Sequence, residues 1–445
     1  MQKTLVDKFF IYKNYIGELL KLSCPIMAGN LAAMLINVGD VIVAGRHSTL
    51  TLGAISVATA IFMTMLIAAL GLMSSISPVI SNMRGARKTT KALFGTTVIY
   101  SLIIGLIFCI LIRSSIQFMG LIGLSEDLFP LVVEYLDFAS WGIFGALLFS
   151  ALKEFLQAYE IVTFPNLIVV FQIFLNLFLN IIFVFGYFGS PELGAKGLAL
   201  ASTLVRTFGA VTLFLYCIPF LKGKSKHIKI YIVDLLKIGW PISFALFFEF
   251  LGFNITAILM GKFSAVLAAA HNIIITLSST TYMFPLSISS AVAIKVGYYN
   301  GENNILNVKR YIFAGLNLMF IFMSITAILY YFFPKPFLSI FTNDMTVVLT
   351  ALPVMTIVIC FLFFDGVQCI CVGALRGLKD TKPIMFTMAI SYLLIGIPIG
   401  SLLAFKFNIV LEGFWSGLAI ALFAACVISS TLLVRKIKKI SKINT

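Results

Sequence analysis

Charged residues are scarce in this sequence, and their scarcity excludes most soluble proteins. Asp, Glu, Lys and Arg make up only 11% of its 445 residues, while 60% are hydrophobic. A soluble domain usually holds about a quarter charged residues. The three histidines show no metal-ligand spacing, and the seven cysteines, an odd number, predict no disulfide framework. The composition therefore predicts an integral membrane protein with little room for a folded soluble domain.

Catalytic motifs are missing as well. The sequence holds no His-Glu-x-x-His and no Gly-x-Ser-x-Gly, and Gly223-Lys224-Ser225 lacks the upstream glycine of a phosphate-binding loop. The net charge of +15 does not indicate nucleic acid, because the basic residues lie between apolar runs, where they orient a membrane protein. We therefore expect no enzyme activity, no cofactor and no nucleic-acid partner.

Apolar runs long enough to cross a bilayer occur twelve times. A helix needs about 20 apolar residues to cross a hydrocarbon layer of ~30 Å. The runs predict helices at residues 22–44, 50–74, 93–112, 129–152, 165–188, 197–220, 238–260, 266–293, 311–333, 347–373, 383–404 and 411–434. We therefore expect an all-α integral membrane protein with twelve transmembrane helices.

The basic residues indicate how these helices are oriented. The two termini and alternate loops hold 25 of the 32 Lys and Arg residues, whereas the other six loops hold one each. Loops rich in Lys and Arg remain in the cytoplasm. This pattern predicts a multi-pass protein of the cell (inner) membrane with both termini in the cytoplasm.

A basic stretch at the centre of the chain predicts a boundary between two halves. We expect an N-terminal lobe at 1–220, a cytoplasmic linker at 221–237 and a C-terminal lobe at 238–445. The linker carries Lys222, Lys224, Lys226, Lys229 and Lys237.

The two halves also resemble each other. A shift of 216 positions without a gap pairs Pro25 with Pro241, Gly45 with Gly261, Ser48 with Ser264 and Gly85 with Gly301. Six helices return the chain to the same side of the membrane. The lobes should therefore be parallel and related by a pseudo-two-fold axis along the membrane normal, an architecture that serves alternating access.

The carboxylates inside the predicted helices include Asp40, Glu249 and Asp365. An ionised carboxylate in mid-bilayer costs at least ~2.5 kcal/mol, and such residues mark functional sites by default. A structural salt bridge is the alternative, mainly for Asp40, which lies six residues before Arg46. Burial favours the protonated acid, while a bound Na⁺ favours the ionised form. One site could thus exchange a proton or Na⁺ for a cationic ligand.

Polar residues stand one helical turn from these acids or from each other. Asn37 precedes Asp40 by one turn, Gln368 follows Asp365 by one turn, and Asn176 and Asn180 are one turn apart. Their oxygens could complete the shell of a cation, although hydrogen bonding between helices explains the asparagines equally well.

Two other ionisable residues within predicted helices are expected to have structural roles. Arg206 is expected to neutralise Asp40 or Asp137. For His271, packing in the core is a more common role than carrying a proton.

These acids lie in stretches that resemble the multidrug and toxic compound extrusion (MATE) transporters, specifically the NorM-type branch. The most specific stretches are Pro25 to Arg46, ending Asp40-Val-Ile-Val-Ala-Gly-Arg46; Gly239-Trp-Pro-Ile-Ser-Phe-Ala-Leu-Phe-Phe-Glu249; Pro285 to Gly301, ending Val-Gly-Tyr-Tyr-Asn-Gly; and Asp365-Gly-Val-Gln through Gly373-Ala-Leu-Arg-Gly-Leu-Lys-Asp-Thr381. The resemblance covers nearly the whole chain.

The resemblance implies secondary active efflux of amphipathic organic cations, driven by inward Na⁺ or H⁺, through a V-shaped pair of lobes. It implies a cation site, which could hold Na⁺, at Glu249 and Asp365 with the hydroxyl of Tyr282, and it implies a coupling role for Asp40. The residues implied or expected to contact substrate are Asn37, Asn176, Asn180, Ser202, Asn272 and Gln368.

The chain departs from the family pattern at Asn180, where many members carry Asp, and at Ser202, where Thr is more common. Asp40 thereby has one carboxylate fewer nearby, which favours the C-terminal acids as the main coupling site. We expect a monomer whose partners are cationic drugs or dyes, the coupling ion and membrane lipid.

Three alternative functions each require residues that this sequence does not offer. A flippase of lipid-linked oligosaccharides, from the same superfamily, would need basic residues to line its cavity, where this chain offers acids. An intramembrane enzyme would need a nucleophile, a base or a metal cluster. A channel would need a ring of repeated polar residues.

Overall fold

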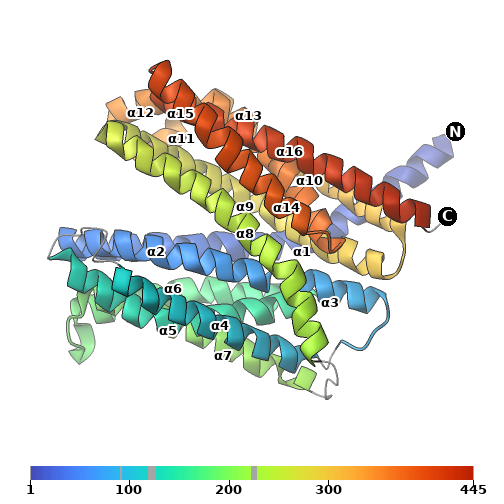
Figure 1. The fold of residues 1–445 in the computed structure, drawn as a ribbon, viewed down its shortest axis with the longest axis horizontal. Coiled ribbons are helices and arrows are strands. Elements are labelled where there is room, and N and C mark those ends of the chain that lie inside the picture. The colour runs from blue at the N-terminus through green and yellow to red at the C-terminus, as the bar shows by residue number, and fades with distance from the viewer. Residues whose placement is uncertain (1, 91–92, 119–126, 222–227, 444–445) are drawn as a thin grey trace. The chain divides into compact units, whose positions relative to one another are not determined.

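The computed structural model describes residues 2–90, 93–118, 127–221 and 228–443. The helices of these residues follow one another in the order shown in Figure 1: α1 Gln2–His47, α2 Thr49–Met73, α3 Ile76–Gly85, α4 Leu93–Phe118, α5 Leu128–Gln157, α6 Thr163–Phe185, η2 Tyr187–Gly189, α7 Gly194–Cys217, η3 Ile218–Leu221, α8 Ile228–Phe263, α9 Ala265–Gly301, α10 Ile305–Phe332, α11 Pro334–Ser339, α12 Met345–Ala351, α13 Val354–Gly377, α14 Lys382–Met388, η4 Ala389–Gly396, α15 Ile397–Lys406 and α16 Val410–Ile443. No strand occurs in this described part of the chain.

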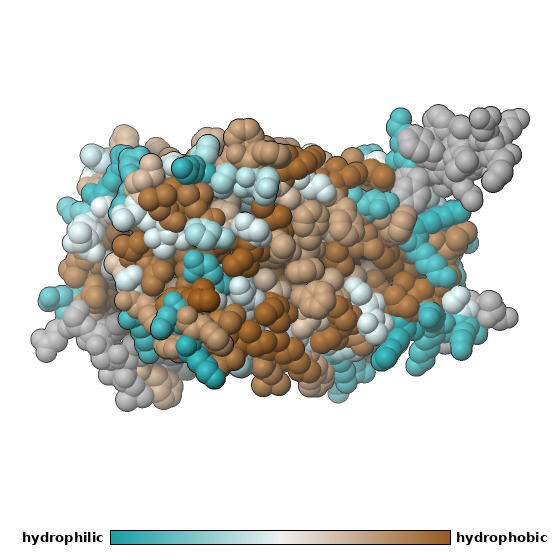
Figure 2. All heavy atoms as spheres, turned by 90° about the horizontal axis from the view of Figure 1, so that it is seen from above, coloured by the Kyte–Doolittle hydropathy of each residue, from teal (hydrophilic) through white to brown (hydrophobic). Residues whose placement is uncertain are grey.

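The all-α membrane fold predicted from the apolar runs is confirmed. Eleven helical segments of the described residues are long and apolar enough to cross a membrane. The predicted helix at 266–293 falls within α9, which is not one of these eleven segments. α9 is a continuous helix that carries polar side chains such as Asn272, Thr276 and Ser278. Large hydrophobic side chains remain exposed along these helices, as expected for surfaces that face lipid, and Figure 2 shows hydrophilic side chains gathered toward the helix ends.

The predicted helix at 347–373 is broken in the structure. A short helix, α12, ends at Ala351, and α13 begins after Pro353, the residue that precedes its first turn. A proline has no backbone N–H to donate and is therefore favoured where a helix starts. Pro25 and Pro241, by contrast, lie inside α1 and α8 without ending them.

The internal repeat predicted from the sequence recurs in the backbone. Ser48 caps the start of α2 with φ −164° and ψ 157°, and its side chain accepts a hydrogen bond from the Thr51 N–H. Ser264, 216 positions later, caps α9 with φ −163° and ψ 157° and accepts a hydrogen bond from the Leu267 N–H. α9 ends at Gly301, and the repeat partner Gly85 ends α3, which follows α2 after a break between Met73 and Ile76.

Left-handed backbone conformations repeat with the same spacing. Arg87 has φ 55° and Asn303, 216 positions later, has φ 58°. Such conformations are uncommon for residues other than glycine. Their coincidence at matched positions supports a repeat of the turn after α3 and α9.

Contacts within the chain divide it into two compact units. We call the first the C-terminal unit, comprising Met1–Met27, Gly85–Arg87 and Phe244–Thr445, and the second the N-terminal unit, comprising Ala28–Arg84 and Lys88–Ser243. Lys222, Lys224 and Lys226 of the predicted linker lie outside the described residues, and α8 begins at Ile228. The predicted lobe boundaries at 220 and 238 stay a prediction.

The first part of α1 is tied into the C-terminal unit by polar side chains. Glu18 accepts a hydrogen bond from the Tyr311 hydroxyl at 2.5 Å and forms an ion pair with Lys295 at 2.9 Å. The Tyr15 hydroxyl donates to Asn307 Oδ1 at 2.8 Å. Because the contact boundary follows Met27, a single continuous helix contributes to both units.

Candidate functional site

A polar cluster surrounds Asp40 in the N-terminal unit. Asp40 lies on α1 and is only 8% exposed. Asn180 of α6 donates from Nδ2 to Asp40 Oδ1 at 2.6 Å, and Ser202 of α7 donates to Asp40 Oδ2 at 3.2 Å. Asn180 Nδ2 also lies 3.1 Å from Asn176 Oδ1. Four of the predicted side chains are therefore brought together, and both oxygens of the carboxylate are held by donors.

The cluster keeps unused hydrogen-bonding capacity. Asn176 Nδ2 and Asn180 Oδ1 are buried and have no partner among the described residues. Buried polar atoms are normally paired, so each such exception calls for an explanation. Asn37, on the same helix as Asp40, is exposed, and no described hydrogen bond joins the two.

Arg206 interacts electrostatically with Asp40, one of its two predicted partners, but forms no ion pair with it among the described residues. Its guanidinium carbon lies 4.6 Å from the ring centroid of Phe62, and its Nη1 has no hydrogen-bond partner within the described part of the chain. Its charge attracts Asp40 electrostatically, without an ion pair within 4 Å among the described residues. Asp137 is instead paired with Arg113.

The second cluster lies in the C-terminal unit and contains two carboxylates. Glu249 lies on α8, and Asp365 lies on α13. The Asp365 side chain is buried, with an exposure of 5%. The two acids are close enough for their charges to repel each other. No hydrogen bond to Asp365 occurs among the described residues, in contrast to Asp40 with its two donors.

Tyr392 is a member of this cluster that the sequence analysis missed. Its side chain is fully buried, and its hydroxyl donates to Glu249 Oε1 at 3.4 Å. Tyr392 lies on η4, a π-helical segment at Ala389–Gly396, and such segments recur at functional sites. A Cβ at Gly252 would lie 2.9 Å from Cδ1 of the ring, so the glycine permits this close packing. No sequence signal separates Tyr392 from other tyrosines in apolar runs.

Tyr282 and Gln368 complete the cluster as predicted neighbours of the acids. The Tyr282 hydroxyl on α9 interacts electrostatically with both carboxylates and accepts a weak bond from Cys369 Sγ at 3.8 Å. Gln368 Nε2 contacts Met388 Sδ at 3.6 Å, while its Oε1 is buried without a partner among the described residues. Asn272 lies nearer the start of α9 and is exposed.

The composition of this cluster suits a cation. Two carboxylates, two phenolic hydroxyls and one unpartnered amide oxygen offer only oxygen atoms, the ligands that hard cations prefer. Two adjacent acids in an apolar environment cannot both ionise without a compensating positive charge. The donor set therefore fits a proton, Na⁺ or an organic cation. Among the described residues, no three His, Cys, Asp or Glu side chains form a metal-binding group.

His271 lies on α9 and makes no described hydrogen bond to either cluster. It is 1% exposed, and neither ring nitrogen has a partner in the described residues. Its ring packs against Trp415 with centroids 5.8 Å apart. His271 thus packs in the core, but the described residues leave both of its ring nitrogens unsatisfied, unlike the satisfied packing residue that was expected.

A comparison with protein families agrees with the motifs. The family model described as MatE matches residues 25–182 and 241–402. The chain is 31% identical over 440 residues to a probable multidrug resistance protein NorM of Idiomarina loihiensis, covering 95% of each chain. It is 29% identical over 436 residues to the multidrug resistance protein NorM of Vibrio cholerae, covering 93% of this chain and 94% of that protein.

The fold also matches a solved structure. A crystal structure of a mutant of the Vibrio cholerae MATE transporter VcmN superimposes with a TM-score of 0.89, covering 96% of this chain and 98% of the other. The sequence identity is 18%, so this likeness speaks for the fold alone.

Proposed function

We propose, from the premise that this chain belongs to the MatE family, that it is a secondary active multidrug efflux antiporter. It exports amphipathic organic cations in exchange for Na⁺ or H⁺ by alternating access. Its relatives are named as multidrug resistance proteins NorM, which supports the transport of drugs. A transporter of this kind is not an enzyme. The observation that carries the proposal is the pair of neighbouring acids, buried Asp365 and half-buried Glu249, which have no basic partner among their described hydrogen bonds and ion pairs.

The electrostatics of this pair supply the exchange. An ionised carboxylate is costly in an apolar environment, and a second one nearby raises that cost through repulsion. A proton, Na⁺ or the ammonium group of a drug can each remove the cost, but they compete for the same oxygens. Binding of the coupling ion therefore displaces the drug, and binding of the drug displaces the ion. This mutual exclusion is what converts an ion gradient into efflux.

The available driving force is adequate for such an exchange. A tenfold ion gradient is equivalent to ~1.4 kcal/mol, and a membrane potential of 100 mV adds ~2.3 kcal/mol per net charge moved. Exchange of one Na⁺ for one monovalent drug moves no net charge. Only the chemical gradient of the ion would then drive efflux, and it could concentrate the drug by the same factor.

Asp40 is the secondary coupling site in this proposal. Donors from Asn180 and Ser202 stabilise its ionised form, and Arg206 adds an attractive charge. A carboxylate stabilised in this way has less need of a visiting cation than Asp365. The unpartnered Asn176 Nδ2 and Asn180 Oδ1 are suited to contacts with a polar part of the substrate.

The proposed setting is the cell (inner) membrane. The helices and the NorM relatives support a multi-pass membrane protein, and the distribution of basic residues supports cytoplasmic termini. The protein would act as a monomer.

Ethidium efflux from loaded cells tests the function. Glu249→Gln and Asp365→Asn should each lower the initial efflux rate about tenfold or more, because each removes a charge that binds both ligands. Glu134→Gln is the matched control, since Glu134 is an exposed acid on α5. Replacing Na⁺ by K⁺ at fixed pH separates sodium from proton coupling. Equal efflux by the parent and both cluster variants, at similar expression, would refute the mechanism.

A further inference from the structure

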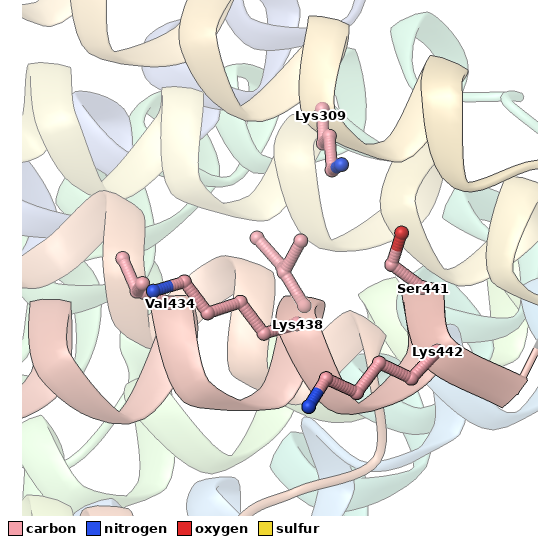
Figure 3. A pocket seen from close by; sticks show the side chains of 6 residues that line it. Lys309, Val434, Lys438, Ser441 and Lys442 are labelled. Atoms are coloured by element: carbon pink, nitrogen blue, oxygen red, sulfur yellow. The ribbon is translucent and has the colours of Figure 1, made fainter.

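A basic groove on the surface of the C-terminal unit lies between α10 and α16. It has a volume of about 430 Å³ and is lined by Lys309 from α10 and by Val434, Ile437, Lys438, Ser441 and Lys442 from α16 (Figure 3). The lining thus combines three ammonium groups and a hydroxyl with two aliphatic side chains. It contains no acidic residue.

The spacing along α16 separates the groove from the rest of the basic C-terminus. Val434, Lys438 and Lys442 follow one another at intervals of four and therefore share one face of the helix. Lys436 lies elsewhere on the helix and is neutralised by Asp380 at 3.0 Å. Asp380 is therefore paired with Lys436 and not with Lys438 of the groove.

The groove also lies where the apolar part of a helix ends and charged residues begin. Residues 411–434 of α16 form an apolar run, and the lysines follow directly after it. Lys309 likewise precedes the apolar run at 311–333 of α10. Figure 3 shows the Lys438 and Lys442 side chains directed back along α16, toward Val434. Helical side chains tilt toward the helix N-terminus, which here is the apolar run.

We propose that this groove binds the headgroup of an anionic phospholipid. The ammonium groups of Lys309 and Lys438 match the negative charge of a lipid phosphate. Val434 and Ile437 match the start of an acyl chain. Basic pockets between membrane helices bind anionic headgroups by this combination. Lysines that only kept the end of the helix in water would not need the aliphatic side chains of Val434 and Ile437 beside them in one groove. The proposal does not depend on the transport function.

Native mass spectrometry of the purified full chain with added cardiolipin tests the site. In Lys309→Gln/Lys438→Gln the dissociation constant should rise about thirtyfold, since each lysine near the membrane surface contributes about fivefold. Arg435→Gln/Lys439→Gln removes two positive charges from α16 residues that do not line the groove, and it should stay within about twofold of the parent. The variant Lys309→Arg/Lys438→Arg should bind as the parent does. An equal loss in both glutamine variants would overturn the proposal.

Two measurements on the parent chain need no variant. Cardiolipin should slow amide hydrogen exchange at 305–310 and 434–442, and protection confined to other segments would contradict the groove. Phosphatidylethanolamine and inorganic phosphate, at the same phosphate concentration, should bind at least about tenfold more weakly. If inorganic phosphate binds as tightly as cardiolipin, the ligand is a free anion and the lipid assignment fails.

Discussion

At the scale of single residues, the two acidic clusters differ in how their charges are compensated. Asp40 receives a hydrogen bond on each oxygen, from Asn180 and Ser202. Glu249 receives one long bond from Tyr392, and Asp365 receives none among the described residues. A buried carboxylate with few hydrogen-bond donors is costly when ionised, so it gains more from binding a cation than a well-bonded carboxylate does. The difference supports the assignment of ion exchange to the C-terminal cluster.

We predict that Tyr392→Phe weakens ion coupling without unfolding the protein. Its hydroxyl stabilises the ionised Glu249, so its loss should raise the half-saturating Na⁺ concentration of Na⁺-driven efflux by up to about tenfold. Tyr330→Phe is the matched control, because that buried hydroxyl bonds the neutral Thr281 at 2.9 Å. The curve of efflux rate against Na⁺ concentration gives the measurement.

The comparison separates this role from the proposed function itself. If Glu249→Gln abolishes efflux while Tyr392→Phe and Tyr330→Phe behave alike, Tyr392 has only a packing role. If Glu249→Gln has no effect either, the carboxylate mechanism fails as a whole.

Sequence reasoning found the acids but not their tyrosine partner, for a physical reason. A carboxylate in an apolar run is conspicuous because it is costly there. Tyr392 is one of 15 tyrosines, and an aromatic ring in a membrane helix needs no special explanation. Its approach to Glu249 depends on the π-helical segment Ala389–Gly396, which alters the face on which the side chain emerges. That geometry comes from tertiary packing and has no pattern in the sequence.

At the scale of helices, the apolar runs predicted positions well and boundaries less well. Each of the twelve predicted ranges overlaps a helix, although 165–188 and 197–220 run past the ends of α6 and α7. One predicted helix, 347–373, is divided in the structure. The break lies at Pro353, which has no backbone N–H, and it separates α12 from α13. The repeat of 216 residues paired Ser48 with Ser264, and the structure shows that both residues cap a helix, a role that the pairing itself did not predict.

We predict that Gly252→Ala on α8 disturbs the C-terminal cluster through packing. The added methyl group would lie 2.9 Å from the Tyr392 ring, so the ring or the helix must move away from Glu249. Efflux should fall about tenfold, by the same route as in Tyr392→Phe. Gly261→Ala on the same helix is the control, since nothing lies within 4 Å of its new Cβ.

The control variant should also gain stability. Replacing a helical glycine by alanine contributes up to ~1 kcal/mol when no contact is violated. Thermal unfolding in detergent should therefore show Gly261→Ala at or above the parent and Gly252→Ala below it. Unchanged efflux in Gly252→Ala would mean that the position of Tyr392 is unimportant for coupling.

At the scale of the whole molecule, α1 has a place in both contact units. Its first part is held by Glu18, Lys295 and Tyr311, while Asp40, later in the same helix, belongs to the other unit. Lys295 is only 7% exposed, and leaving a buried charge without its partner is costly. The ion pair therefore anchors the first part of α1, the helix that also carries Asp40. Composition predicted the membrane class, but this division of α1 follows from contacts that no periodicity encodes.

The orientation of the molecule is the last prediction, and it rests on charge alone. The termini and alternate loops carry 25 basic residues against six in the opposite loops. Such an imbalance keeps the basic side in the cytoplasm. Alkaline phosphatase, active only outside the cytoplasm, should be inactive when fused to the C-terminus and active when fused after Asn408, in the turn between α15 and α16. Green fluorescent protein should give the reverse pattern. Phosphatase activity at the C-terminus would invert the topology, and it would move the groove at Lys309 and Lys438 to the opposite leaflet.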